Sequence, residues 1–167
     1  RAEFVDASEA ERKSAGDKQS HDSLMAELAA RRPGDAVLSE EGVDDPVRLD
    51  AGRVWIVDPL DGTREFAELG RDDWAVHVAL WSAGDLVAGA VALPAQNTTL
   101  STPDVAAPRA RLDGPPRIVV SRTRPPAVAL AVRDALDGTL VEMGSAGAKV
   151  AAVIRGVADV YVHAGGQ

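Results

Sequence analysis

Two aspartates three positions apart form the chemically most informative pattern in the sequence. Asp58 and Asp61 belong to the segment Asp58-Pro59-Leu60-Asp61-Gly62-Thr63. Proline restricts the backbone of such a turn, so that both carboxylates can face one point. Mg²⁺ takes hard oxygen ligands at about 2.1 Å, usually a few carboxylates completed by water and substrate. The segment therefore predicts a magnesium site, although a solvated turn that caps a helix contains the same residue types.

A second pair of carboxylates, Glu40 and Glu41, follows a short apolar segment. Paired glutamates in a loop are usually solvated and carry little weight alone. Together with the aspartate pair they become candidate metal ligands, because acidic side chains from two loops can share one pocket.

Three further residues of the aspartate segment supply groups that hydrolysis at a metal site needs. The backbone carbonyl of Leu60 is another oxygen donor, and Gly62 permits close backbone approach. Thr63 opens a helix whose free N–H groups are a natural seat for a phosphate, and its hydroxyl is placed to orient an attacking water.

The elements that must position these residues follow from the hydrophobic pattern. Residues 1–20 are polar and weakly patterned, whereas 20–30 predict an amphipathic helix with Leu24, Met25 and Leu28 on one face. The apolar run 53–57 predicts a central strand that ends at Asp58-Pro59, where proline stops the ladder. The other elements expected in this half are strands over 36–39, 74–81, 86–93 and 98–102, an acidic loop over 42–52 with a helical turn after Pro46, and a helical turn over 62–69.

The second half predicts alternating strands and helices, which is typical of an α/β arrangement. Its expected elements are strands over 117–120, 141–143 and 159–163 and helices over 126–136 and 146–156. Residues 103–116 are rich in proline, alanine and arginine, and we place a linker at 106–116. The predicted organisation is an α+β metal-binding subdomain over 1–105 and part of an α/β subdomain over 117–167.

Composition excludes several classes of function. The net charge of −8 and pI of about 4.8 disfavour nucleic-acid polymers, whose binding needs a basic surface. No apolar stretch approaches the roughly 20 residues that span a bilayer, and no secretory signal is visible. Without cysteine there is no disulfide framework or thiolate site. We expect a cytoplasmic protein without membrane contacts, whose small anionic ligand would need a bound cation or local arginines.

The motifs together resemble the inositol monophosphatase superfamily. The resemblance comprises Glu40-Glu41, the segment 58–63 and Gly144-Ser145-Ala146-Gly147-Ala148-Lys149. It implies a layered fold of alternating helices and sheets and hydrolysis of a phosphomonoester by metal-activated water. It also implies two or three Mg²⁺ ions and inhibition by lithium. The implied metal ligands are Glu40, Asp58, the Leu60 carbonyl and Asp61; the implied catalytic residues are Asp17, Glu40 and Thr63, with Asp17 paired to Thr63.

Within that superfamily the chain is similar to the CysQ-type 3′(2′),5′-bisphosphate nucleotidases of actinobacteria. This similarity rests on Thr63-Arg64-Glu65-Phe66, on Ser121-Arg122-Thr123-Arg124, and on a histidine where inositol-directed members have a glutamate. It implies 3′-phosphoadenosine 5′-phosphate as the substrate, with AMP and phosphate as products. The implied substrate-binding residues are Gly62, Thr63, Arg64, Ser121, Arg122, Ser145 and His163.

Other interpretations stay open on the sequence. Arg64 and Glu65 also fit an exposed helix turn, Arg122 and Arg124 a solvated loop, and His163 an ordinary strand end. The protein would then be a broader phosphatase of inositol monophosphate or fructose 1,6-bisphosphate, or a catalytically inactive metal- or nucleotide-binding module. The resemblance also leads us to expect that the family's first helix and its Trp-Asp metal motif lie outside this chain. The sequence leaves open whether the protein forms a homodimer.

Overall fold

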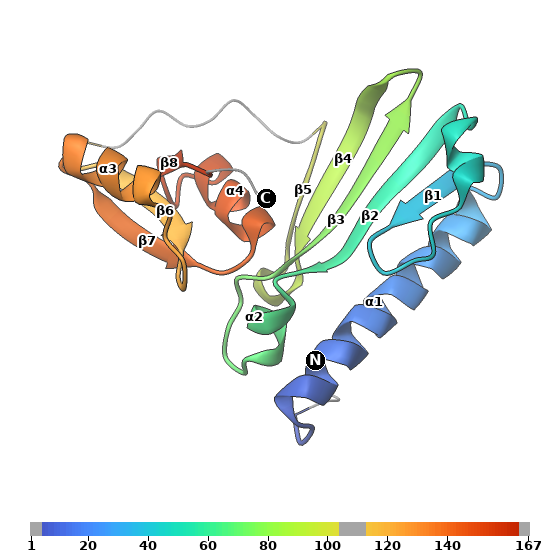
Figure 1. Ribbon diagram of the computed structural model, residues 1–167, viewed down its shortest axis with the longest axis horizontal. Coiled ribbons are helices and arrows are strands. Elements are labelled where there is room, and N and C mark those ends of the chain that lie inside the picture. Colours follow the sequence, from blue (N-terminus) through green and yellow to red (C-terminus); the bar gives the residue numbers. More distant parts are fainter. Residues whose placement is uncertain (1–4, 104–112, 164–167) are drawn as a thin grey trace.

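A mixed sheet and a smaller parallel sheet organise the protein, whose computed structural model describes residues 5–103 and 113–163. The strand order is β1-β2-β3-β4-β5 in the first sheet and β7-β6-β8 in the second (Figure 1). The expected combination of helices and sheets is confirmed. The strands are β1 (Ala36–Ser39), β2 (Arg53–Asp61), β3 (Ala75–Ser82), β4 (Asp85–Leu93), β5 (Thr98–Ser101), β6 (Arg117–Ser121), β7 (Thr139–Met143) and β8 (Val160–Tyr161). The helices are α1 (Glu9–Arg31), α2 (Thr63–Ala67), α3 (Ala127–Ala135) and α4 (Ala146–Ile154), with 3₁₀ turns η2 (Pro46–Leu49) and η3 (Pro94–Gln96).

Helix α1 begins at Glu9, so the expectation of a helix confined to residues 20–30 is wrong. Its first half lacks apolar periodicity and is stabilised locally instead. Ser8 and Glu11 form a capping box, in which each side chain binds the other residue's backbone N–H. Further along, Lys13 pairs with Glu9 at 2.6 Å one helical turn away.

Strand β2 continues through Pro59 to Asp61, so the prediction that it ends at Asp58-Pro59 is also wrong. Asp58 pairs with His77 and Asp61 with Ala75 of the antiparallel strand β3, with a register irregularity between them. A proline, which has no N–H to donate, is tolerated at such a bulge. The carboxylates of Asp58 and Asp61 therefore come from a bulged strand end rather than from a free turn.

The two sheets are joined by α4, and α1 lies on the other side of the larger sheet (Figure 1). Ala75 and Leu93 of the larger sheet pack against Ala148 and Ala151 of α4. On its opposite side α4 contributes to a core with the small sheet, where Val119 is fully buried. The start of α4 is thus brought beside the bulged end of β2.

The second half follows its predicted pattern, with one difference that concerns a candidate residue. Strand β8 covers only residues 160–161, so His163 lies beyond the strand rather than at its end. Most of the predicted linker falls within residues 104–112, outside the described residues. In the described part of the chain, every helix is too short or too polar to cross a bilayer.

Candidate metal centre

Asp58, Asp61 and His77 form a compact group of side chains of the types that bind metal ions. One ligand atom from each lies within 4.8 Å of the others. The arrangement follows from strand pairing, because Asp58 stands directly opposite His77 on β3. His77 was not among the predicted site residues. No local motif marks it, and only the register of β2 against β3 brings it to the aspartates.

Glu40 reaches this group from the neighbouring parallel strand. Its backbone N–H donates to the Val57 carbonyl at 3.0 Å, which places residue 40 beside residue 58. The charge of Asp58, with burial and further acidic neighbours, raises the pKa of Glu40. Burial, followed by the charge of Asp61, raises the pKa of Asp58. The carboxylates of Glu40, just after β1, and of Asp58 and Asp61, at the end of β2, are thus crowded together.

Asp61 is the most tightly held of these carboxylates. It accepts hydrogen bonds from the Ser145 hydroxyl and the Gly147 N–H, each at 2.6 Å, and lies 3.0 Å from Nε2 of His77. Burial alone would raise its pKa, but the bonds from His77, Ser145 and Gly147 outweigh burial and lower the pKa to about 2. Asp61 is therefore a carboxylate fixed in its charged form at the start of α4.

Thr63 and Asp17 meet beside the cluster, as expected from the family resemblance. The Thr63 hydroxyl lies 3.2 Å from a carboxylate oxygen of Asp17 and 3.1 Å from the Leu60 carbonyl. Burial raises the pKa of Asp17, and the bond from Thr63 opposes this shift. Gly62, which precedes α2, has φ of +88°, a left-handed conformation that favours glycine. The loop from β2 into α2 is thus anchored to α1 at the hydroxyl of Thr63.

Close packing of α4 against β3 explains why residue 147 is a glycine. A Cβ atom on Gly147 would lie 2.3 Å from Nε2 of His77, far inside van der Waals contact. Because residue 147 is glycine, the imidazole can lie against the helix start while it bonds Asp61. Gly147 and His77 are therefore matched in size across the site.

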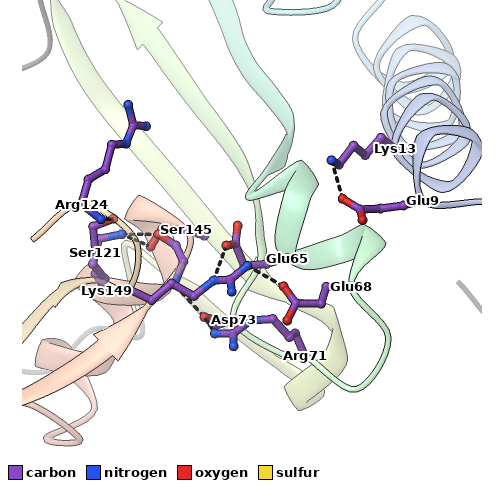
Figure 2. Close-up of polar contacts among 12 residues, drawn as sticks. Glu9, Lys13, Glu65, Glu68, Arg71, Asp73, Ser121, Arg124, Ser145 and Lys149 are labelled. Carbon is purple, nitrogen blue, oxygen red and sulfur yellow. Dashed lines mark hydrogen bonds and ion pairs between the residues drawn. The ribbon is translucent and has the colours of Figure 1, made fainter.

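The other predicted substrate-binding residues make contacts outside the acidic cluster. Ser121 accepts from the Arg124 N–H (Figure 2). Arg122 pairs with Glu65 at 2.9 Å and with Glu68 at 2.5 Å. Glu65 is buried, so it is not part of an exposed helix turn. Arg64 and His163 are exposed. Arg122 therefore joins the small sheet to α2, and its pairing with two glutamates occupies its guanidinium.

The donor set of the cluster fits a hard divalent cation. Carboxylate oxygens dominate it, and repulsion between acidic groups contributes to two raised pKa values: that of Glu40, where the charge of Asp58 is the main cause, and that of Asp58, where the charge of Asp61 adds to burial. A cation would relieve that repulsion. His77, already bonded to Asp61, suits the role of an outer partner that orients a metal-binding carboxylate. The cluster opens onto a cavity of about 880 Å³ lined by Glu40, Asp58, His77 and apolar residues of the larger sheet and α4.

The fold and the acidic cluster agree with the family that the sequence comparison identifies. The chain belongs to the inositol monophosphatase family, whose family model matches residues 5–132. It is 53% identical over 161 residues to the 3′-phosphoadenosine 5′-phosphate phosphatase of Mycobacterium tuberculosis (strain CDC 1551 / Oshkosh), covering 92% of this chain and 60% of that protein. It is 35% identical over 131 residues to the 3′(2′),5′-bisphosphate nucleotidase CysQ of Escherichia coli K12, covering 77% and 52%.

Solved structures show the same fold at lower identity. The inositol monophosphatase-II of Staphylococcus aureus MSSA476 superposes with a TM-score of 0.72 at 21% identity, over 90% of this chain and 63% of that one. Related structures are described as SaIMPase-II bound to 2′AMP, with a TM-score of 0.68, and to inositol monophosphate, with 0.66. The chain spans 60% of the length of the Mycobacterium tuberculosis relative, 52% of that of CysQ and 63% of that of the Staphylococcus aureus structure.

Proposed function

We propose that the protein is a Mg²⁺-dependent phosphomonoesterase that hydrolyses 3′-phosphoadenosine 5′-phosphate to AMP and phosphate. The observation that carries the proposal is the convergence of Asp58, Asp61 and Glu40 beside the Thr63–Asp17 pair. The substrate assignment is supported by relatives at 53% identity that bear that name. Glu40, Asp58, Asp61 and the Leu60 carbonyl are the proposed metal ligands.

The chain's own residues account for the remaining chemistry. Mg²⁺ bound at this cluster supplies positive charge that neutralises the phosphate and lowers the pKa of a coordinated water. Thr63 holds the attacking water through its hydroxyl, while Asp17 accepts the hydroxyl proton and fixes its direction. Glu40, which follows β1, assists Thr63 and Asp17 in polarising this water. Asp61, which His77 and the start of α4 hold charged, would bind the cation with its carboxylate.

The other predicted substrate-binding residues are proposed to contact three different parts of the substrate. Gly62, Thr63 and Ser145 surround Asp61 and are proposed to contact the phosphate that is cleaved. Arg64 and His163 are exposed nitrogen donors and are proposed to bind the second phosphate. Ser121 and Arg122 would approach the nucleotide only if Arg122 exchanged a glutamate partner for phosphate.

A substrate panel tests this proposal. Phosphate release is measured with 3′-phosphoadenosine 5′-phosphate, inositol 1-phosphate and fructose 1,6-bisphosphate, with Mg²⁺ and after chelation. We expect the bisphosphate nucleotide to have the largest kcat/KM, complete dependence on Mg²⁺, and inhibition by millimolar lithium. Equal turnover of the three substrates would favour a broader phosphatase, and nucleotide binding without phosphate release would favour an inactive binding module.

A further inference from the structure

A buried carboxylate that the proposed mechanism does not use lies between the two sheets. Asp73, just before β3, is 4% exposed. Its carboxylate accepts from the Gly144 N–H at 2.6 Å and is paired with Arg71 (Figure 2). Its backbone carbonyl accepts from the next amide, that of Ser145, at 3.2 Å. One residue thus binds two consecutive amides of the turn that leads into α4.

That turn supplies the groups that hold Asp61. The Ser145 hydroxyl and the Gly147 N–H both donate to one carboxylate oxygen of Asp61 at 2.6 Å. The turn has little freedom to move, because a Cβ atom on Gly144 would lie 2.1 Å from Cγ of Glu65. Any shift of residues 144–147 would therefore change the position of the Asp61 carboxylate.

We propose that Asp73 is a positioning residue for the metal centre, which acts by fixing the Gly144–Ser145 turn and through it Asp61. This inference rests on the proposed metal site but has a readout of its own. A charged acceptor suits this place, because hydrogen bonds to an ionised group are stronger than neutral ones. Arg71 balances the charge, so that the carboxylate can be buried without a large penalty. Loss of a group bonded directly to a metal ligand typically weakens metal affinity by 10–100-fold, and Asp73 acts on Asp61 through the turn that holds it.

The test compares Asp73→Ala and Asp73→Asn with a matched control, Asp159→Ala. Asp159 likewise accepts from a backbone N–H, that of Arg117 at 2.8 Å, and pairs with the same arginine's guanidinium. It lies at the base of the small sheet, outside the acidic cluster. Binding of Mn²⁺ is measured by electron paramagnetic resonance on each protein, and thermal unfolding is measured in parallel. Hydrogen exchange of the Gly147 amide is followed in metal-free protein.

We expect Asp73→Ala to weaken Mn²⁺ binding about tenfold and to accelerate Gly147 exchange about as much. Asp73→Asn keeps an oxygen acceptor for Gly144 and should restore most of the affinity. Asp159→Ala should lower the melting temperature without either effect. If Asp73→Ala does not fold, Asp73→Ser, too short to reach Gly144, takes its place.

Other outcomes decide against one proposal or the other. If the Asp73 variant changes Mn²⁺ binding and Gly147 exchange no more than Asp159→Ala does, the positioning role is overturned. If the wild-type protein does not bind Mn²⁺, the proposed function fails. Gly147 exchange then decides the role of Asp73 alone, since that amide donates to Asp61 in the metal-free protein.

Discussion

Replacing Gly147 with alanine perturbs the contact between α4 and His77 with a single methyl group. The new Cβ would lie 2.3 Å from Nε2 and 2.4 Å from Cε1 of His77, whereas ordinary contacts begin near 3.4 Å. The imidazole or the helix start must therefore move by about 1 Å. The 3.0 Å contact between His77 and Asp61 would then exceed hydrogen-bonding distance.

Overpacking and helix propensity have opposite effects on the stability of Gly147→Ala. Overpacking costs about 1–3 kcal/mol, and replacing a helical glycine with alanine returns at most about 1 kcal/mol. With the full 1 kcal/mol returned, the net loss is about 0–2 kcal/mol, which should lower the melting temperature by at most roughly 8 °C in a domain of this size. Displacement of His77, the outer partner of Asp61, should reduce Mg²⁺ affinity by at least about tenfold, which is the lower end of the range for such partners. Unfolding is followed by circular dichroism, and Mg²⁺ affinity by titrating phosphate release.

Two controls separate this mechanism from general destabilisation. Gly138→Ala creates a similar clash, 2.3 Å from Cδ1 of Ile118, in the small sheet; it should lower the melting temperature without changing Mg²⁺ affinity. In a His77→Ser background the clash with the imidazole is absent and only a 3.1 Å contact with Cβ of Ala75 remains, so the further effect of Gly147→Ala should be much smaller. Wild-type Mg²⁺ affinity in Gly147→Ala, or an equal loss of affinity in Gly138→Ala, would refute the reasoning.

Three further predictions concern the acidic cluster. In metal-free protein the folded pKa of Asp61, about 2, lies below its ordinary 3.8. The ionised carboxylate therefore stabilises the fold by about 2 kcal/mol above pH 3.8, and this stabilisation is lost as the pH falls towards 2. Urea unfolding at a series of pH values should show the loss in wild type but not in Asp61→Asn, and parallel curves of stability against pH for the two proteins would contradict it. Asp61→Asn should also abolish Mg²⁺-dependent hydrolysis, and near-normal phosphate release would exclude Asp61 as a ligand. Thr63→Val, which removes the hydroxyl bonded to Asp17, should lower kcat roughly 100-fold while leaving Mn²⁺ binding unchanged; loss of Mn²⁺ binding would assign Thr63 to the metal site instead.

The sequence predicted the strands of the larger sheet because their apolar runs are dense and bounded by turn residues. It did not predict the first half of α1, since residues 9–19 contact solvent along most of their length and show no apolar period. The capping pattern of Ser8 and Glu11 was the available signal. The end of β2 was misplaced because proline usually stops a ladder, whereas here a bulge accommodates it.

The candidate site shows the same division between local and tertiary information. Glu40, Asp58 and Asp61 could be singled out because their spacing and residue types form a motif. His77 and Asp73 could not, since each contributes through a partner distant in sequence: the register of β3 brings His77 to Asp58, and Asp73 meets Gly144 across 71 residues. Arg122 was assigned to substrate from its motif, and its partners on α2 became visible only in the fold.

Crystals of the protein grown with Mn²⁺, with anomalous diffraction recorded at the manganese edge, test the central claim most directly. The account predicts an anomalous peak coordinated by carboxylate oxygens of Asp58 and Asp61 at about 2.2 Å, with the Glu40 carboxylate facing the same ion or its neighbour. Density without a peak between these carboxylates, or a peak only at some other place on the molecule, would contradict it.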